Sequence, residues 1–160
     1  MKKILIIIAF LIIGTESWAQ SNTADENAIK KVLEKESEAA QNRNYEEWIK
    51  CFAPTPDVAF GFSHLLPTYM VRGYDELAEI GKKVFSENLE SSFESFEFTD
   101  FKIRINGTSA FVTYNQTNSL KDGTKVRYYK AEYLEKINNE WKMIGHIFLQ
   151  EPKPDTRAEK

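Results

Sequence analysis

The sequence predicts an α+β fold in which helices come first and an antiparallel sheet follows. Three observations lead to this prediction. Apolar residues recur at helical spacing up to about residue 89, and after Ser91-Ser92 the pattern changes to the alternation typical of strands. The later part also contains Asn106-Gly107 and Asp122-Gly123, which favour tight hairpins because both central positions accept a positive φ.

Three helices are expected, with one hairpin between the second and the third. Thr23 with Glu26 makes a capping-box pattern ahead of a first helix over about residues 25–42. Asn44 with Glu47 repeats that pattern ahead of a short second helix that ends near Pro54. Residues 57–73 read as a hairpin, and a third helix follows it with an apolar stripe.

Four long strands make up the second half of the chain. Their sequences are FESFEFTDFKIRI, AFVTYNQTNSL, KVRYYKAEYLEKI and EWKMIGHIFLQ. Turns at Asn106-Gly107, Asp122-Gly123 and Asn138-Asn139 join them in order, so the strands are expected to form an antiparallel meander.

Both ends of the sequence differ from the domain between them. Residues 1–19 read as a secretory signal peptide, with two lysines, an apolar run too short to span a bilayer and a Ser17-Trp18-Ala19 cleavage pattern. Residues 152–160 contain two prolines and no periodicity, so they are expected to form a flexible tail. The prediction is one domain over residues 20–151 in a periplasmic or secreted protein that is not held in a membrane after cleavage.

Composition excludes several kinds of function. A net charge of −3 argues against nucleic-acid binding, which needs a basic face. Cys51 is the only cysteine, so no intramolecular disulfide can form, and it is interpreted as a small buried group. The two histidines, His64 and His146, are isolated, so no metal site is expected and no cofactor is predicted.

The order of elements resembles the nuclear transport factor 2-like (SnoaL-like) superfamily, over roughly residues 25–150. The best local matches are AIKKVLEKESEAAQNRNYEEW, INGTSAFVTY and YLEKINNEWKMI, which resemble small SnoaL-like proteins secreted by bacteria. The resemblance implies a cone-shaped fold, with three N-terminal helices packed on a strongly bent antiparallel sheet. It also implies a pocket at the open end and, in many members, a homodimer.

Strand register gives two alternatives for the pocket face. If both late turns have two residues, Asn115, Lys130, Glu132, Trp141 and Met143 share one face, which the resemblance assigns to the pocket. The opposite face would carry Tyr114, Tyr129, Tyr133 and His146, and a bulge would exchange the two sets. The candidate ligand-binding residues are Trp48, Tyr114, Asn115, Lys130, Glu132, Trp141 and Met143.

Three functions are consistent with these patterns. The leading hypothesis is an exported domain that binds a small, largely apolar molecule. The first alternative is an isomerase, dehydratase or cyclase that transfers a proton next to a carbonyl, with Glu132, His146 and His64 as weak catalytic candidates. The second is a homodimeric interaction module on the convex face, where His146 is expected together with Tyr129, Tyr133, Ile144 and Phe148.

Overall fold

The computed structural model describes residues 23–63, 69–87 and 93–151. The predicted signal peptide, His64 and the tail over residues 152–160 therefore lie outside the described residues. Among the described helices, none is both long and apolar enough to cross a membrane.

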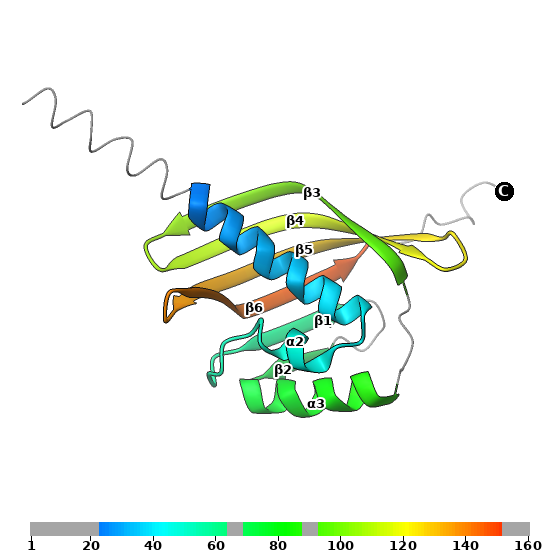
Figure 1. Cartoon of the computed structure of the whole chain (residues 1–160), viewed down its shortest axis with the longest axis horizontal. Helices are drawn as coiled ribbons and strands as arrows, with labels where there is room; N and C mark the ends of the chain where they lie inside the picture. Colours follow the sequence, from blue (N-terminus) through cyan, green and yellow to red (C-terminus); the bar gives the residue numbers. More distant parts are fainter. Residues whose placement is uncertain (1–22, 64–68, 88–92, 152–160) are drawn as a thin grey trace, which may run out of the picture.

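Within the described residues, six strands form one sheet in the order β2-β1-β6-β5-β4-β3 (Figure 1). The strands are β1 (Ala59–Ser63), β2 (Tyr69–Arg72), β3 (Phe93–Asn106), β4 (Ser109–Leu120), β5 (Lys125–Ile137) and β6 (Glu140–Gln150). The expected hairpin is β1–β2 and the expected meander is β3 to β6, all paired antiparallel. The prediction of a wholly antiparallel sheet is wrong at one place, because β1 runs parallel to β6.

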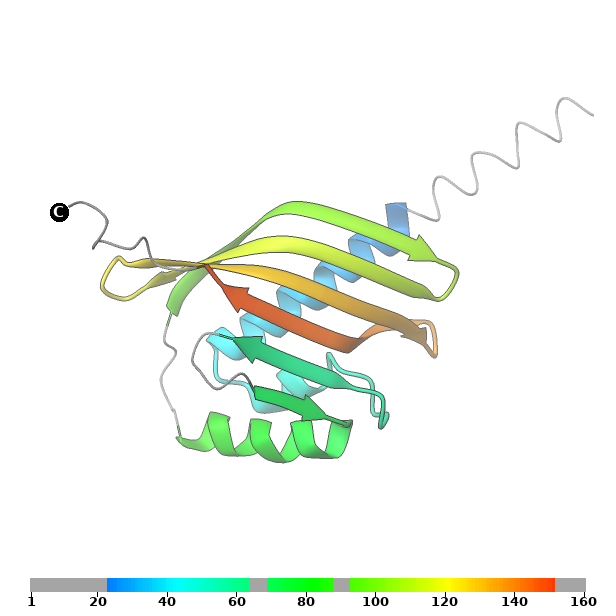
Figure 2. The ribbon, with the colours of Figure 1, turned by 180° about the vertical axis from the view of Figure 1, so that it is seen from behind.

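The three helices of the described residues lie on one side of this bent sheet (Figure 1), and none of them lies on the other side (Figure 2). They are the long N-terminal helix over residues 23–41, α2 (Tyr45–Ile49) and α3 (Tyr74–Glu87). Only the first two precede all the strands, because α3 lies between β2 and β3 in the chain. Helix α2 is shorter than expected because residues 51–53 pair with β6 through backbone hydrogen bonds between Met143 and both Cys51 and Ala53.

The hydrophobic core lies between the sheet and the helices. The N-terminal helix contributes Ile29 and Leu33, and the concave face of the sheet contributes Val112, Leu134 and Met143, all at most 1% exposed. Full burial of a side chain of this size stabilises the fold by about 1.5–3 kcal/mol. This contact holds the N-terminal helix against the concave face of the sheet.

The turn between β4 and β5 is longer than the sequence indicates, and this changes which residues face inward. Leu120 accepts a hydrogen bond from Gly123 N–H and donates its own N–H to Thr124. The register therefore differs by one residue from the predicted one. Lys130 lies opposite Tyr114, whereas the predicted register places it opposite Asn115. Tyr114 therefore faces inward, and the prediction that Asn115 does so is wrong: its side chain donates to Asp100.

A β-bulge in β6 also changes the predicted register. The last hairpin begins as expected, with Lys136 opposite Trp141 and Leu134 opposite Met143. Tyr133 then lies opposite Gly145, so Ile144 is an extra residue in β6. Because the alternation shifts after this point, His146 faces the interior, and its predicted place on the convex face is wrong.

Candidate functional site

A cavity of about 340 Å³ lies between the sheet, the N-terminal helix and α3. Most of its wall is apolar. The apolar lining residues are Ala40, Trp48, Phe60, Val71, Leu77, Ile80, Val84, Phe85, Phe93 and Phe148. The polar side chains on its wall come from the middle of the N-terminal helix and from the sheet, so the cavity has one polar side and one apolar side.

The imidazole of His146 lies on the polar side of the cavity and packs against an aromatic ring. Its ring stacks on Phe60, with centroids 4.5 Å apart and planes 9° from parallel. Nδ1 lies 2.8 Å from Glu132 Oε2. The two atoms are close but lack the alignment of a hydrogen bond, and neither has another hydrogen-bond partner in the described part of the chain. Since Nδ1 faces Glu132, Nε2 is the ring nitrogen left for the cavity.

Glu132 lies behind His146 and is fully buried. Its Oε1 accepts a hydrogen bond of 3.1 Å from the Tyr114 hydroxyl. Burial raises the pKa of Tyr114 well above its ordinary value, and the charges of Glu132 and Glu36 raise it further. Tyr114 therefore remains a donor, and Glu132 is held between a phenol and an imidazole.

A second pair of charged groups lies beside the first. Glu36 on the N-terminal helix accepts hydrogen bonds from Trp48 Nε1 at 2.8 Å and from the Ser37 hydroxyl at 3.2 Å. Lys130 Nζ is 3.7 Å from Glu36 Oε2. Burial acts to raise the pKa of Glu36, but the charges of Lys130 and His146 and the two hydrogen bonds outweigh it, so the pKa is lowered. Glu36 is therefore a carboxylate inside the protein.

Two amides extend the polar side along β4. Gln116 Nε2 donates to Asn118 Oδ1 at 2.8 Å, and Gln116 Oε1 lies 3.3 Å from the Ser37 hydroxyl. Gln116 and Asn118 are buried and line the cavity. They offer neutral hydrogen-bonding groups next to the charged pair.

Aromatic packing shapes the apolar side. Trp48 lies against Phe52, Phe60 and Phe85, with ring centroids 4.9 to 5.9 Å apart. Helix α3 approaches Trp48 at Gly81, where a methyl group would come within 2.6 Å of the indole. The glycine therefore permits a close contact that closes this wall.

The structure distributes the predicted ligand-binding residues over several places. Trp48 and Lys130 line the cavity, whereas Tyr114 and Glu132 lie behind its polar side. Met143 belongs to the core, Trp141 lines a different hollow and Asn115 lies on the outer face. The catalytic candidates Glu132 and His146 are brought together, and His64 lies outside the described residues.

Sequence reasoning missed four polar residues of the cavity: Glu36, Ser37, Gln116 and Asn118. A signal for the first two exists, because Ile29, Leu33 and Ala40 mark the inward stripe of the helix and residues 36 and 37 fall on that stripe. Polar residues at such positions indicate a buried polar site. The two amides carry no such signal, since β4 is polar on both faces beyond Tyr114.

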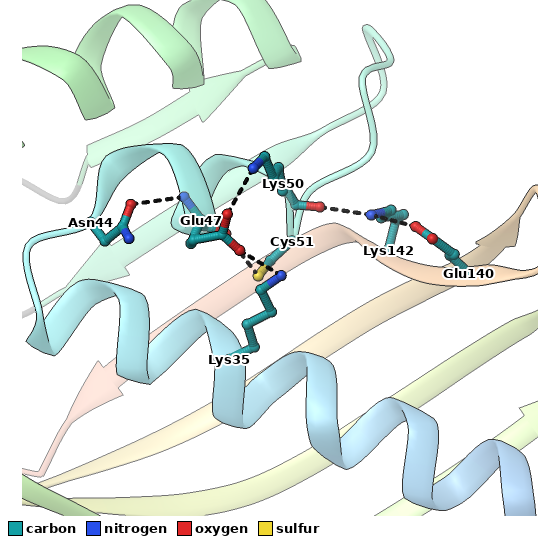
Figure 3. A network of polar contacts seen from close by, with 7 residues as sticks. All are labelled: Lys35, Asn44, Glu47, Lys50, Cys51, Glu140 and Lys142. Atoms are coloured by element: carbon teal, nitrogen blue, oxygen red, sulfur yellow. Dashed lines mark hydrogen bonds and ion pairs between the residues drawn. The ribbon is translucent and has the colours of Figure 1, made fainter.

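A second hollow, of about 530 Å³, lies between the N-terminal helix and the β5–β6 hairpin. Its lysines are Lys31, Lys35, Lys50, Lys136 and Lys142. Figure 3 shows that Glu47 pairs with both Lys35 and Lys50 and that Glu140 pairs with Lys142, all at 2.7 to 2.9 Å. Asp25 pairs with Lys136 at 2.7 Å, so four of these five lysines have a carboxylate partner and the hollow is a network of ion pairs.

Cys51 lies next to this network and is buried, as the sequence indicates. Its Sγ donates to the Glu47 carbonyl at 3.4 Å (Figure 3). Burial, followed by the charge of Glu36, raises the pKa of the thiol to about 12. The residue is therefore a thiol at neutral pH and not a nucleophile. Within the described ranges, no group of three or more acidic, histidine or cysteine side chains could hold a metal ion.

Comparison with protein families identifies the architecture. The family model described as SnoaL-like domain matches residues 29–148. The chain belongs to the SnoaL-like domain family. No curated protein shows significant sequence similarity to it.

Solved structures share the fold of this SnoaL-like domain. A Nostoc punctiforme protein of unknown function with a cystatin-like fold has a TM-score of 0.67 at 15% identity, over 81% of this chain and 93% of that one. An NTF2-like protein of unknown function from Pseudomonas putida has a TM-score of 0.67 at 14% identity, over 84% and 92%. A putative ketosteroid isomerase from Parabacteroides distasonis has a TM-score of 0.61 at 16% identity, over 77% and 86%. At these identities the similarity concerns the fold alone.

Proposed function

We propose that this SnoaL-like domain binds a small, largely apolar molecule in the cavity between the sheet and the helices. The observation that carries the proposal is the cavity itself, with an apolar wall and a few buried polar groups on one side. Its volume of about 340 Å³ lies at the small end of ligand pockets, which run from about 300 to 1,000 Å³. The polar groups would orient the ligand, and the apolar wall would supply most of the affinity.

Native mass spectrometry of protein purified from its own host tests this proposal. The wild-type protein is expected to carry an extra mass that leaves on denaturation. Ala40→Phe places a ring in the cavity and should abolish the extra mass, whereas Glu38→Phe, on the exposed side of the same helix, should retain it. Retention of the same mass by Ala40→Phe would contradict binding in the cavity.

A second proposed function is proton transfer at a carbon next to a carbonyl. The pairing of His146 with Glu132 favours it, because a carboxylate behind one ring nitrogen orients the other nitrogen toward a substrate. His146 Nε2 would take the proton, and the electron pair of the broken C–H bond would move toward the carbonyl oxygen to form an enolate.

Hydrogen exchange of methyl naphthyl ketone in D2O tests this second proposal, with proton NMR as the readout. The wild-type protein should speed replacement of the methyl hydrogens by deuterium. His146→Gln should abolish this effect, and Tyr129→Phe, on the outer face, should not change it. Equal exchange with wild type and His146→Gln would reject His146 as the base.

We also propose that the convex face of the sheet pairs with a second copy of the chain. Five large apolar side chains on β4, β5 and β6 are between 39% and 50% exposed on this face: Phe111, Tyr129, Tyr133, Ile147 and Leu149. The patch differs from the predicted one, because Ile144, His146 and Phe148 are not among its residues. Light scattering should give the mass of a dimer, with Ile147→Glu shifting it to a monomer; a monomeric wild type would reject the interface.

Export remains a proposal based on residues 1–19. Sequencing the N-terminus of protein recovered from the periplasm or the medium should give Gln20 as the first residue. An intact Met1 would reject cleavage.

A further inference from the structure

Lys130 is a buried lysine on the cavity wall, and its ion-pair partner lies beyond hydrogen-bond distance. The residue is 8% exposed and lines the cavity. Its ion-pair partner is Glu36 Oε2 at 3.7 Å, which is beyond hydrogen-bond distance. The other contacts of Nζ are with the rings of Tyr114 and Phe148, at 5.9 and 5.6 Å from their centroids. An ammonium carries three donors, so the group is available to an acceptor in the cavity.

Glu36 limits which acceptor can be accommodated. Its two oxygens already take hydrogen bonds from Trp48 and Ser37, so it remains in place beside Lys130 as a fixed negative charge. Two glutamates and two basic residues are buried on this side: Glu36, Glu132, Lys130 and His146. The basic residues therefore do not outnumber the acidic ones. No positive charge is left over to balance an anionic ligand.

We infer that the Glu36–Lys130 pair selects for an uncharged ligand with an oxygen acceptor at one end. Lys130 donates a hydrogen bond to that oxygen, and Glu36 disfavours a carboxylate at the same place. Ketones, esters and amides with an apolar body have this chemistry. The inference rests on the proposed binding function and specifies the class of ligand that the same cavity takes.

Three naphthalene derivatives of similar shape provide a matched test by equilibrium dialysis. Methyl naphthyl ketone has a neutral acceptor, isopropylnaphthalene has none and naphthoate is anionic. A hydrogen bond from a charged donor should make the ketone bind about tenfold or more tightly than the hydrocarbon. Naphthoate should bind at least tenfold more weakly than the ketone.

One single variant and one double variant separate the roles of the pair. Glu36→Gln keeps an acceptor for Trp48 and makes the site more positive by one charge, so naphthoate should gain at least tenfold in affinity relative to the ketone. Lys130→Met leaves Glu36 buried without its cation and risks unfolding. The double variant Glu36→Gln with Lys130→Met removes both charges, and it should bind the ketone and the hydrocarbon equally.

The outcomes distinguish this inference from the function on which it rests. Equal binding of all three compounds to the wild-type protein would leave the cavity as a binding site but overturn the role of the pair. Preference for naphthoate in the wild type would also overturn it. Absence of binding by all three would reject both the binding function and the inference.

Discussion

Replacing Glu132 should destabilise the protein more than any other single change on the polar side of the cavity. The carboxylate is 0% exposed, lies 2.8 Å from His146 Nδ1 and accepts the Tyr114 hydroxyl at 3.1 Å. Glu132→Ala leaves the buried Tyr114 hydroxyl without its acceptor, at a cost of about 1–3 kcal/mol, and takes away the carboxylate that faces His146 Nδ1. The void left by the side chain adds to this. The expected loss in free energy of unfolding is about 3–5 kcal/mol, a large part of the 5–15 kcal/mol typical of a domain.

Urea unfolding followed by circular dichroism measures this loss. Glu132→Gln retains the shape and an acceptor for Tyr114, so it should cost about 1–2 kcal/mol. Glu135→Ala is the matched control on the same strand, because its partner Tyr133 is exposed, and it should change stability by less than about 0.5 kcal/mol. A cost below about 1 kcal/mol for Glu132→Ala would refute the interpretation of Glu132 as a central buried acceptor.

Three further predictions concern Glu36, Cys51 and Gly81. Because the pKa of Glu36 is lowered in the folded protein, its carboxylate stabilises the fold at pH values above the ordinary pKa of a glutamate. The free energy of unfolding should therefore fall as the pH decreases through the folded-state pKa. In acid denaturation, the free energy of unfolding of Glu36→Gln should fall less than that of the wild type. The raised pKa of Cys51, about 12, predicts no alkylation by iodoacetamide at neutral pH until the protein unfolds; modification of the folded protein, seen by mass spectrometry, would contradict this. Gly81→Ala should lower the free energy of unfolding by about 1–3 kcal/mol, because the added methyl group meets the Trp48 indole. This loss is expected despite the better helix propensity of alanine. A variant more stable than the wild type would contradict the close contact.

Most of the fold could be predicted from the sequence because its signals are local. The capping pattern at Asn44 and Glu47 is present as a hydrogen bond from Glu47 N–H to the Asn44 side chain. The turn at Asn138-Asn139 has positive φ at both residues, as a tight hairpin requires. Alternation and turn residues were therefore sufficient to order the four strands of the meander. The parallel contact of β1 with β6 has no local signal, because it joins segments more than 80 residues apart.

The candidate site was harder to predict because it depends on two single-residue changes in register. Because the turn after Leu120 is longer than predicted, Tyr114 faces inward where Asn115 was expected. The bulge at Ile144 turns His146 inward. Neither feature has a distinctive sequence pattern. The structure consequently combines residues of both alternative faces, with Lys130 and Glu132 from one and Tyr114 and His146 from the other.

A crystal structure of the protein with methyl naphthyl ketone tests the central claim most directly. The ligand should lie in the cavity between the sheet and α3, with its carbonyl oxygen within hydrogen-bond distance of Lys130 Nζ and its rings against Trp48 and Phe85. A ligand seated on the convex face or in the lysine-lined hollow, with the cavity closed over by its own side chains, would contradict the proposed binding site.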